Sequence, residues 1–322
     1  MSGTAFVPSP GSRSAGDFAV VARVASATAM LMFFLIVVGS VVRTTGSGLA
    51  CPDWPLCHGR LIPPFQFNIL VEWFHRLIAL IVGLGLLATA VLTALRPAPR
   101  ARLGGLAALA IALYFTQALL GALTVWKLLD PNVVSGHLAV ALLLFATLLT
   151  LGAIARRESE PAVAAPAGRG GLLPWFAVAT VAIWLQAVLG GMVSTNHASL
   201  VCHDWPTCNG DWFPPMTGLV GLQMSHRYGA YLLVTLLGLL AWRARGAADP
   251  FVARAGTLLF VFVLLQAGIG ILNILLGIPV WVSAMHLANA AFMLALSLLA
   301  TLRLAAVTSA VPATLEQPME AR

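Results

Sequence analysis

The sequence is poor in charged residues, and this scarcity excludes most classes of soluble protein. Of its 322 residues only 9% are Asp, Glu, Lys or Arg, whereas 60% are hydrophobic. A soluble domain usually carries about 25% charged residues. The composition therefore predicts a protein that folds inside a membrane.

Eight apolar runs are each long enough to cross a hydrocarbon core of about 30 Å, which takes roughly 20 helical residues. Backbone polar groups find no water in that core, so continuous runs of this length predict helices rather than strands. A signal peptide is the alternative for the first run, but this run is longer than a typical signal region and its equivalent recurs in mid-chain. The expected spans are 20–41, 70–95, 103–126, 133–155, 173–192, 217–242, 253–275 and 280–304.

Basic residues are scarce in one set of connections, and this predicts the orientation of the chain. Those connections hold only Arg43, Arg60 and Lys127, with Arg76 and Arg227 just inside helix starts. The positive-inside rule then places both termini in the cytoplasm. The net charge of +7 reports topology and gives no support to nucleic-acid binding. The remaining basic residues lie in or beside the alternate connections and the termini: Arg13, Arg23, Arg96, Arg100, Arg102, Arg156, Arg157, Arg169, Arg243, Arg245, Arg254, Arg303 and Arg322.

Cysteine is also rare, and all four cysteines fall in the two longest outer loops. An oxidising compartment favours disulfides there, and we predict the pairs Cys51–Cys57 and Cys202–Cys208. Reduced or redox-cycling thiols are the alternative. Zinc is disfavoured because His58 and His203 do not complete a consistent ligand set. The repeated Asp-Trp-Pro at 53–55 and 204–206 is expected to shape these loops.

An internal repeat organises the chain. Shifting the sequence by 151 residues aligns 44–64 with 195–215, so that CPDWPLCHG meets CHDWPTCNG, and pairs His75 with His226. Further along, a shift of 149 residues pairs His137 with His286. Self-similarity on this scale predicts two copies of one structural unit. Each copy has an even number of spans, so both must share one orientation about an axis along the membrane normal.

The predicted fold is therefore all-α and integral to the membrane, with eight transmembrane helices in two pseudo-symmetric parallel four-helix bundles. The first 16 residues and the segment after about 307 are expected to be poorly ordered. The expected division is a cytoplasmic tail at 1–19, an N-terminal half at 20–155, a cytoplasmic linker at 156–172, a C-terminal half at 173–305 and a cytoplasmic tail at 306–322.

Four of the seven histidines lie inside apolar spans, within about two turns of the outer helix end: His75, His137, His226 and His286. At 1.5 Å per residue they lie at similar depth, two in each half. A lone histidine in a membrane helix often only hydrogen-bonds a neighbouring helix, but four at repeat-equivalent positions favour ligands. Two imidazoles on facing helices of a bundle can coordinate a haem iron from opposite faces. Zinc is disfavoured because neither half offers a third or fourth ligand in register.

The two halves differ at one ionisable position. Glu72 precedes His75 by three residues and shares its helix face, whereas the equivalent residue beside His226 is Gln223. An ionisable residue inside a span suggests function. It predicts that the N-terminal half carries the chemistry and that the C-terminal half holds a permanent cofactor. The alternative is a structural carboxylate that caps the helix or pairs with Arg76.

Other polar residues near the histidines carry weaker signals. Arg76 and Arg227 are candidates for contacts with haem propionates, although snorkelling to the interface explains them equally well. Gln117 and Gln266 each lie four residues before a glycine. Small residues let helices approach closely, so these glutamines are expected to hydrogen-bond between packed helices.

Together these residues resemble a known family, the haem A synthases of cytochrome oxidase assembly. The resemblance covers roughly residues 20–305 and implies an oxidoreductase that converts the C8 methyl group of haem O into a formyl group, giving haem A. The motifs that carry it are EWFHR at 72–76, GH at 136–137, MSHR at 224–227, MH at 285–286 and the loop TTGSGLACPDWPLCHG.

The resemblance also implies where each haem binds. The resident haem b is expected on His226 and His286, and the substrate haem O beside Glu72, His75 and His137. Glu72 is expected to orient water or to accept protons. Haem O synthase and oxidase assembly factors are the implied partners. Paired cysteines in both loops suggest a bacterial form, so the expected location is a bacterial plasma membrane.

Two other functions are compatible with the same residues. A di-haem electron carrier or quinone oxidoreductase of the cytochrome b type would retain two equal haems b and form no modified product. A haem transporter would use the histidines only to handle cargo. Parallel repeats suit a transporter, but transporter sites usually involve broken helices near mid-membrane. The histidines here lie near the ends of unbroken spans.

Overall fold

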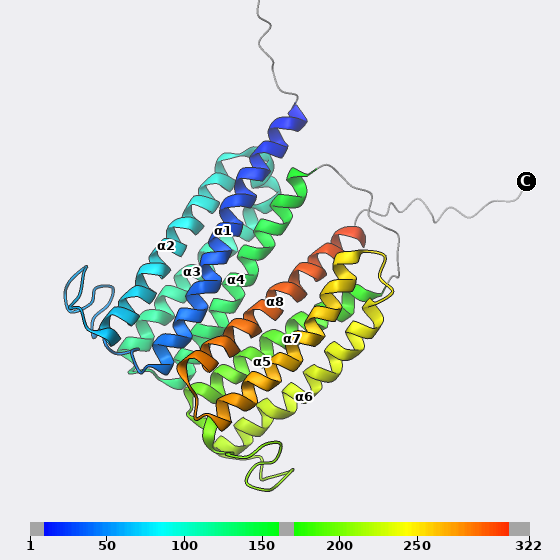
Figure 1. Ribbon diagram of the computed structural model, residues 1–322. Helices are drawn as coiled ribbons and strands as arrows, with labels where there is room; N and C mark the ends of the chain where they lie inside the picture. Colours follow the sequence, from blue (N-terminus) through cyan, green and yellow to red (C-terminus); the bar gives the residue numbers. More distant parts are fainter. Residues whose placement is uncertain (1–9, 161–170, 309–322) are drawn as a thin grey trace, which may run out of the picture.

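The computed structural model describes residues 10–160 and 171–308, which form eight long α-helices in two bundles (Figure 1). The sequence-based prediction of an all-α membrane protein built from two four-helix halves is confirmed. The first bundle contains α1 (Pro10–Thr44), α2 (Phe67–Leu95), α3 (Pro97–Trp126) and α4 (Pro131–Ser159). The second contains α5 (Leu172–Thr195), α6 (Gly218–Ala244), α7 (Pro250–Leu275) and α8 (Val280–Thr308).

Seven of the described helices have the length and apolar composition needed to cross a membrane. The eighth, α6, falls short because its first turns carry Gln223, His226 and Arg227. It has 27 residues and packs against α5 and α7 along the bundle, so it spans with its neighbours (Figure 1). Large apolar side chains such as Leu84 and Leu232 are exposed on the outer faces. Lipid is the solvent that such a surface requires.

Two helices continue beyond the apolar runs that were predicted to cross the membrane. Helix α1 begins at Pro10, so residues 10–16 are helical where the sequence predicted poor order, and Asp17 of the same helix forms an ion pair with Arg96 at 2.9 Å. Helix α4 likewise continues into the predicted linker, where Glu158 pairs with Arg102 at 3.1 Å. Ion pairs at this end of the bundle thus extend both helices beyond their apolar runs.

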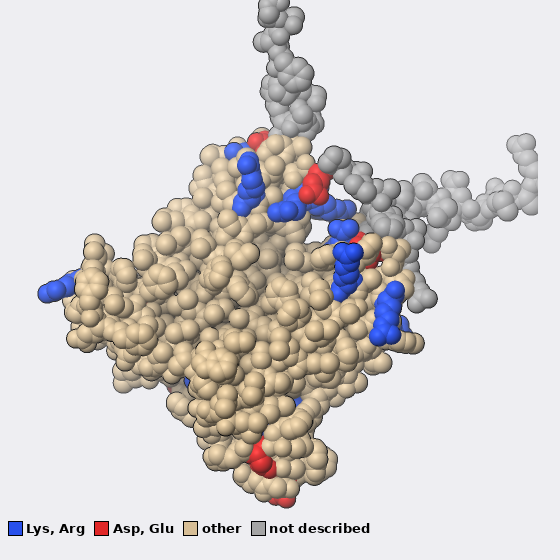
Figure 2. Space-filling view, viewed as in Figure 1, with Lys and Arg blue, Asp and Glu red and all other residues tan. Residues whose placement is uncertain are grey.

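Basic side chains gather at the end of the bundle where α1 begins and α8 ends (Figure 2). The two cysteine-containing loops extend from the opposite end (Figure 1). This is the distribution expected if one end faces the cytoplasm. Residues 1–9 and 309–322 of the tails that were predicted to be poorly ordered lie outside the described residues, as do residues 161–170 of the linker, Arg169, Arg322 and the side chain of Arg13.

The two halves meet through α1 and α4 of the first bundle and α5 and α8 of the second. Helix α1 packs on α8 as α5 packs on α4, and α4 also packs on α8. These contacts are related by the sequence repeat, so the interface has an approximate two-fold axis. The buried core continues across it, with Leu142 and Leu148 of α4 and Phe176 of α5 fully buried.

Candidate functional site

A large cavity of about 1230 Å³ runs between the two halves. Pockets for one small molecule usually measure about 300–1,000 Å³, so this cavity exceeds what a single small ligand needs. Most of its wall is apolar. The side chains of all four histidines singled out from the sequence line it: His75, His137, His226 and His286. The fold thus brings both predicted pairs to one continuous space.

Each of these imidazoles lies directly against a glycine of the preceding helix. A Cβ atom added to any of these glycines would stand between 2.8 and 3.3 Å from the imidazole Cε1 atom. The absence of a side chain therefore lets the ring rest on the neighbouring backbone. The pairs are His75 with Gly39, His137 with Gly121, His226 with Gly190 and His286 with Gly270.

The ring nitrogens differ in their access to the cavity. The Nδ1 atoms of His75, His137 and His286 are buried and have no hydrogen-bond partner among the described residues. The Nδ1 atom of His226 is held by the Gln186 amide at 3.0 Å. Nε2 is therefore the nitrogen through which these rings can bind a ligand. Imidazoles on two facing helices of each half fit the axial ligands of a haem iron.

Gln117 and Gln266 form the interhelical hydrogen bonds that the sequence predicted, but with different atoms. The Nε2 atom of Gln117 lies 3.1 Å from His137 Nε2. The Nε2 atom of Gln266 instead donates to the main-chain oxygen of His286 at 3.0 Å. Both predicted contacts are confirmed, although the repeat gave no sign that they would be unequal.

Sequence reasoning missed Gln186, the third member of this set. Its Nε2 atom donates to the main-chain oxygen of His226 at 2.8 Å as well as contacting the ring. The signal was present, because Gln186 precedes Gly190 by four residues, as the other two glutamines precede theirs. At the fourth equivalent position, before Gly39, the residue is Leu35. His75 therefore lacks a glutamine neighbour of this kind.

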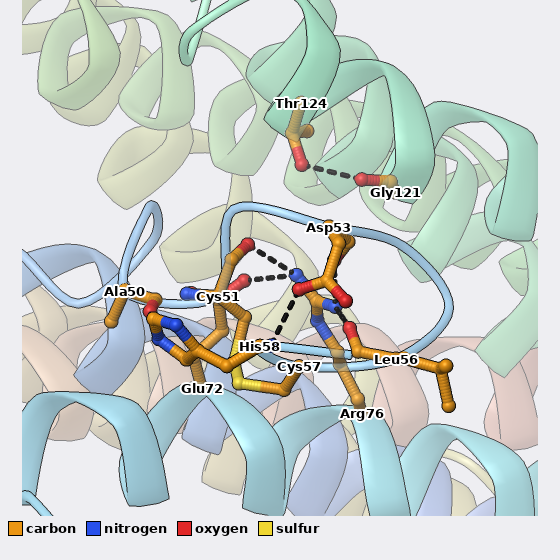
Figure 3. Close-up of polar contacts among 10 residues, drawn as sticks. All are labelled: Ala50, Cys51, Asp53, Leu56, Cys57, His58, Glu72, Arg76, Gly121 and Thr124. Carbon is orange, nitrogen blue, oxygen red and sulfur yellow. Dashed lines mark hydrogen bonds and ion pairs between the residues drawn. A yellow bond between two sulfur atoms is a disulfide. The ribbon is translucent and has the colours of Figure 1, made fainter. Parts of the chain in front are cut away.

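Arg76 and Arg227 anchor the two cysteine-containing loops. Arg76 donates from Nη2 to the Cys51 oxygen at 3.0 Å and from Nη1 to the Leu56 oxygen at 2.6 Å (Figure 3). Both predicted disulfides, Cys51–Cys57 and Cys202–Cys208, are formed. Much of each guanidinium is thus committed to the loop, and the propionate contact stays a prediction. Arg227 binds the repeat-equivalent oxygens of Cys202 and Thr207.

The repeated aspartates shape these loops, as predicted. The Asp53 carboxylate accepts hydrogen bonds from the main-chain nitrogens of Gly59 at 2.7 Å and His58 at 2.6 Å. These donors, the Gly59 amide foremost, hold the pKa of Asp53 below its usual value. Asp204 makes the equivalent bonds in the second loop, where the Thr207 hydroxyl is the main group that lowers its pKa.

Glu72 is buried, and both of its oxygens are engaged. Oε2 accepts from the Cys51 main-chain nitrogen at 2.8 Å, and Oε1 pairs with Arg76 Nη2 at 2.6 Å (Figure 3). The ion pair named as the structural alternative is therefore present. Glu72 also lines the cavity, and its catalytic role stays a prediction. The equivalent Gln223 donates instead to the Ser199 oxygen at 3.3 Å, so the loops are attached differently in the two halves.

Comparisons with known proteins agree with the geometry. A family model described as "Cytochrome oxidase assembly protein" matches residues 22–298. The chain is 32% identical over 243 residues to a protein named "Heme A synthase" from Symbiobacterium thermophilum, covering 72% of this chain and 78% of that one. It is 30% identical over 309 residues to a "Heme A synthase" from Shewanella oneidensis, an alignment that covers 83% of this chain and 91% of that protein. A third protein of that name, from Methylobacterium radiotolerans, is 30% identical over 311 residues, which cover 80% of this chain and 83% of that protein.

Proposed function

Because this chain belongs to the haem A synthase family of cytochrome oxidase assembly proteins, we propose that it oxidises the C8 methyl group of haem O to a formyl group, with haem b as a resident cofactor. Membership makes the protein an oxidoreductase of haem A biosynthesis. The finer statements about the reacting carbon, the cofactor and the site residues are the proposal. They are supported chiefly by the four histidines that line one cavity in two repeat-related pairs.

The C-terminal pair, His226 and His286, would hold haem b. Both rings rest against glycines, Gly190 and Gly270, and the Gln186 amide contacts Nδ1 of the His226 ring. Groups that orient the ring of a metal-binding histidine typically strengthen metal binding. When bound, haem b supplies one-electron redox chemistry that the side chains lack. The protein contributes the position of the two imidazoles and the apolar walls that exclude water.

The N-terminal pair, His75 and His137, would hold the substrate haem O. Among the described residues that line the cavity, the one carboxylate is Glu72 of this half. Glu72 is held there by its contact with Arg76 at 2.6 Å. A carboxylate here would orient a water molecule or accept a proton as the methyl group is oxidised through an alcohol and a hydrated aldehyde. Each of these steps releases two electrons, which must pass to an external electron acceptor. The same residue fixes the loop through Cys51, so its two roles must be separated by experiment.

The proposed orientation places both termini in the cytoplasm and the two disulfide loops outside, in the plasma membrane of a bacterium. The gathering of basic side chains at the end opposite those loops supports it (Figure 2). Haem O is too apolar to diffuse freely through water, so haem O synthase is the proposed source of substrate. Oxidase assembly factors are the proposed recipients of the product.

The test is the analysis of haems extracted from membranes of a host that makes haem O but no haem A, with and without this gene. Chromatography with mass detection should show the formyl haem or its alcohol precursor only when the gene is present. His75→Ala and His137→Ala should abolish the product. The matched control His203→Ala changes an exposed loop histidine and should not. A haem-loaded protein that yields only haem b would favour the di-haem electron carrier instead.

A further inference from the structure

Two glutamines at equivalent positions of the repeat point their amides at different atoms. Gln117 and Gln266 each lie four residues before the glycine that faces a histidine. The amide of Gln117 contacts Nε2 of the His137 ring at 3.1 Å. The amide of Gln266 donates to the main-chain oxygen of His286 at 3.0 Å and makes no hydrogen bond with that ring in the described structure. The difference lies at the histidines that would bind iron.

A single residue difference explains the two orientations. Asn289 donates from Nδ2 to the Oε1 atom of Gln266 at 2.6 Å and to the Phe262 main-chain oxygen at 3.0 Å. These bonds hold the Gln266 oxygen toward α8 and leave its NH₂ group to face the main chain. The shift of 149 residues places Val140 at the position of Asn289. Valine has no donor, and accordingly the Oε1 atom of Gln117 is buried without a partner in the described structure.

The contact with His137 covers the one ring nitrogen that a ligand can use. Nδ1 of His137 is buried against Gly121, so only Nε2 faces the cavity side. An iron atom can bind there only after the Gln117 amide has moved. The hydrogen bond to the ring is the one that the amide makes in the described structure, because its oxygen is not bonded to any described group. In the C-terminal half Asn289 keeps Gln266 away from the equivalent nitrogen of His286.

We propose that Gln117 is a displaceable cap on His137 that keeps haem binding in the N-terminal half reversible, and that Asn289 removes the equivalent cap from His286 so that haem is retained in the C-terminal half. This inference rests on the proposed function, which assigns substrate to the first site and cofactor to the second. A substrate site must release its product, whereas a cofactor site must not. One net hydrogen bond changes such an equilibrium roughly 3- to 10-fold.

The test is haem release from the full-length protein in detergent, loaded with haem b and mixed with excess apomyoglobin as the acceptor. Wild-type protein should release haem in a fast and a slow phase. His75→Ala should remove the fast phase and His226→Ala the slow one, which assigns each phase to a half. Absorbance of the acceptor reports release without any need for catalytic turnover.

Two independent changes should slow the fast phase roughly 3- to 10-fold, because without the cap the iron can rebind Nε2 before the haem leaves the cavity. Gln117→Leu removes the cap, and Val140→Asn supplies the donor that turns Gln117 away from the ring. Gln66→Leu makes the same substitution at an exposed position before α2 and should leave both phases unchanged. Fast phases that are unaltered or quicker in both variants would overturn the role of Gln117.

The reciprocal change tests whether Asn289 keeps Gln266 away from the His286 ring. Asn289→Val should speed the slow phase by a similar factor, because Gln266 becomes free to contact the His286 ring. Adding Gln266→Leu to Asn289→Val should restore slow release, because the double variant has no glutamine to contact the ring. If Asn289→Val acted only by loosening the packing at residue 289, the second substitution would not restore it. A slow phase that stays accelerated in the double variant would overturn this role of Asn289.

The outcome for this inference is separable from the outcome for the proposed function. Unaltered release rates in a protein that binds two haems and makes haem A would overturn the inference alone. Altered rates in a protein that makes no haem A would retain the inference and contradict the proposed reaction. A protein that binds no haem in the N-terminal half would overturn the inference, and one that binds none in the C-terminal half would contradict the proposed cofactor site as well.

Discussion

Arg43 donates from Nη1 to the main-chain oxygen of Ser194 at 2.9 Å, and these two residues occupy equivalent positions in the two repeats, 151 residues apart. An arginine that binds its own repeat equivalent lies at the approximate two-fold axis. Next to it, the Ser135 and Thr195 hydroxyls hydrogen-bond at 2.8 Å between α4 and α5. Polar contacts therefore join the halves beside the cavity, where apolar packing alone provides little directionality.

Arg43→Met is expected to weaken the junction between the halves. A hydrogen bond from a charged donor contributes about 1.5–3 kcal/mol, and methionine retains much of the apolar stem. We expect the free energy of unfolding to fall by about 1–2 kcal/mol, allowing for partial replacement of the bond. Denaturation in mixed detergent micelles, followed by circular dichroism, measures it. Arg60→Met, at an exposed loop position, serves as the control, and equal midpoints for the two variants would contradict the prediction.

Gly190→Ala is expected to reduce haem binding in the C-terminal half. The new Cβ would stand 2.8 Å from Cε1 of His226, so the ring must shift. Changes in groups that orient metal-binding histidines typically weaken binding about 10- to 100-fold. The haem content, measured by absorbance after purification, should fall to one haem per protein. Gly268→Ala is the control because a Cβ there meets nothing within 4 Å, and normal haem content in Gly190→Ala would refute the expectation.

Glu72→Gln is expected to separate catalysis from loop anchoring. The amide can still accept from the Cys51 nitrogen, but it cannot take up a proton as a carboxylate does. Formation of oxidised haem should fall about 10²- to 10⁴-fold while haem content is preserved. Initial rates and haem content are measured on the same membranes, with Glu158→Gln near the opposite end of the bundle as the control. Full turnover in Glu72→Gln would leave this residue only its structural role.

Acid is expected to loosen the first loop only at low pH. The folded-state pKa of Asp53 lies below its ordinary value of 3.8, so the carboxylate stabilises the loop fully above that value. This contribution is lost as the pH falls through the lower folded-state pKa. Hydrogen exchange of residues 51–60, corrected for intrinsic rates, should therefore be uniform from pH 7 to about 5.

Asp53→Asn should raise exchange at the His58 and Gly59 amides throughout that range, because the charge that attracts both donors is gone. Asp211→Asn, in the other loop, should not alter the 51–60 segment. Protection that is equal in Asp53→Asn and wild type would show that the disulfide alone orders the loop.

Local properties of the chain were sufficient to predict the fold. Runs of apolar residues fix helix number, and the repeat fixes the relation of the halves, because both follow from spacing along the chain. The spacing of His75 and His137, and of their repeat equivalents, predicted that the four lie together, and all four line one cavity. The sequence did not predict that α1 and α4 continue beyond their apolar runs, because the ion pairs near those helix ends join distant parts of the sequence.

The sequence by itself determined the eight helices, the two halves, the four histidines and the cysteine pairs. Tertiary structure alone decided which atoms meet. It paired Glu72 with both Arg76 and the Cys51 nitrogen, placed a glycine against each imidazole, and brought Gln186 to His226. It also turned Gln117 toward a ring nitrogen and Gln266 away from one. The physical reason is that an amide or carboxylate chooses among partners on neighbouring helices, and only helix packing determines which partners are within hydrogen-bonding distance.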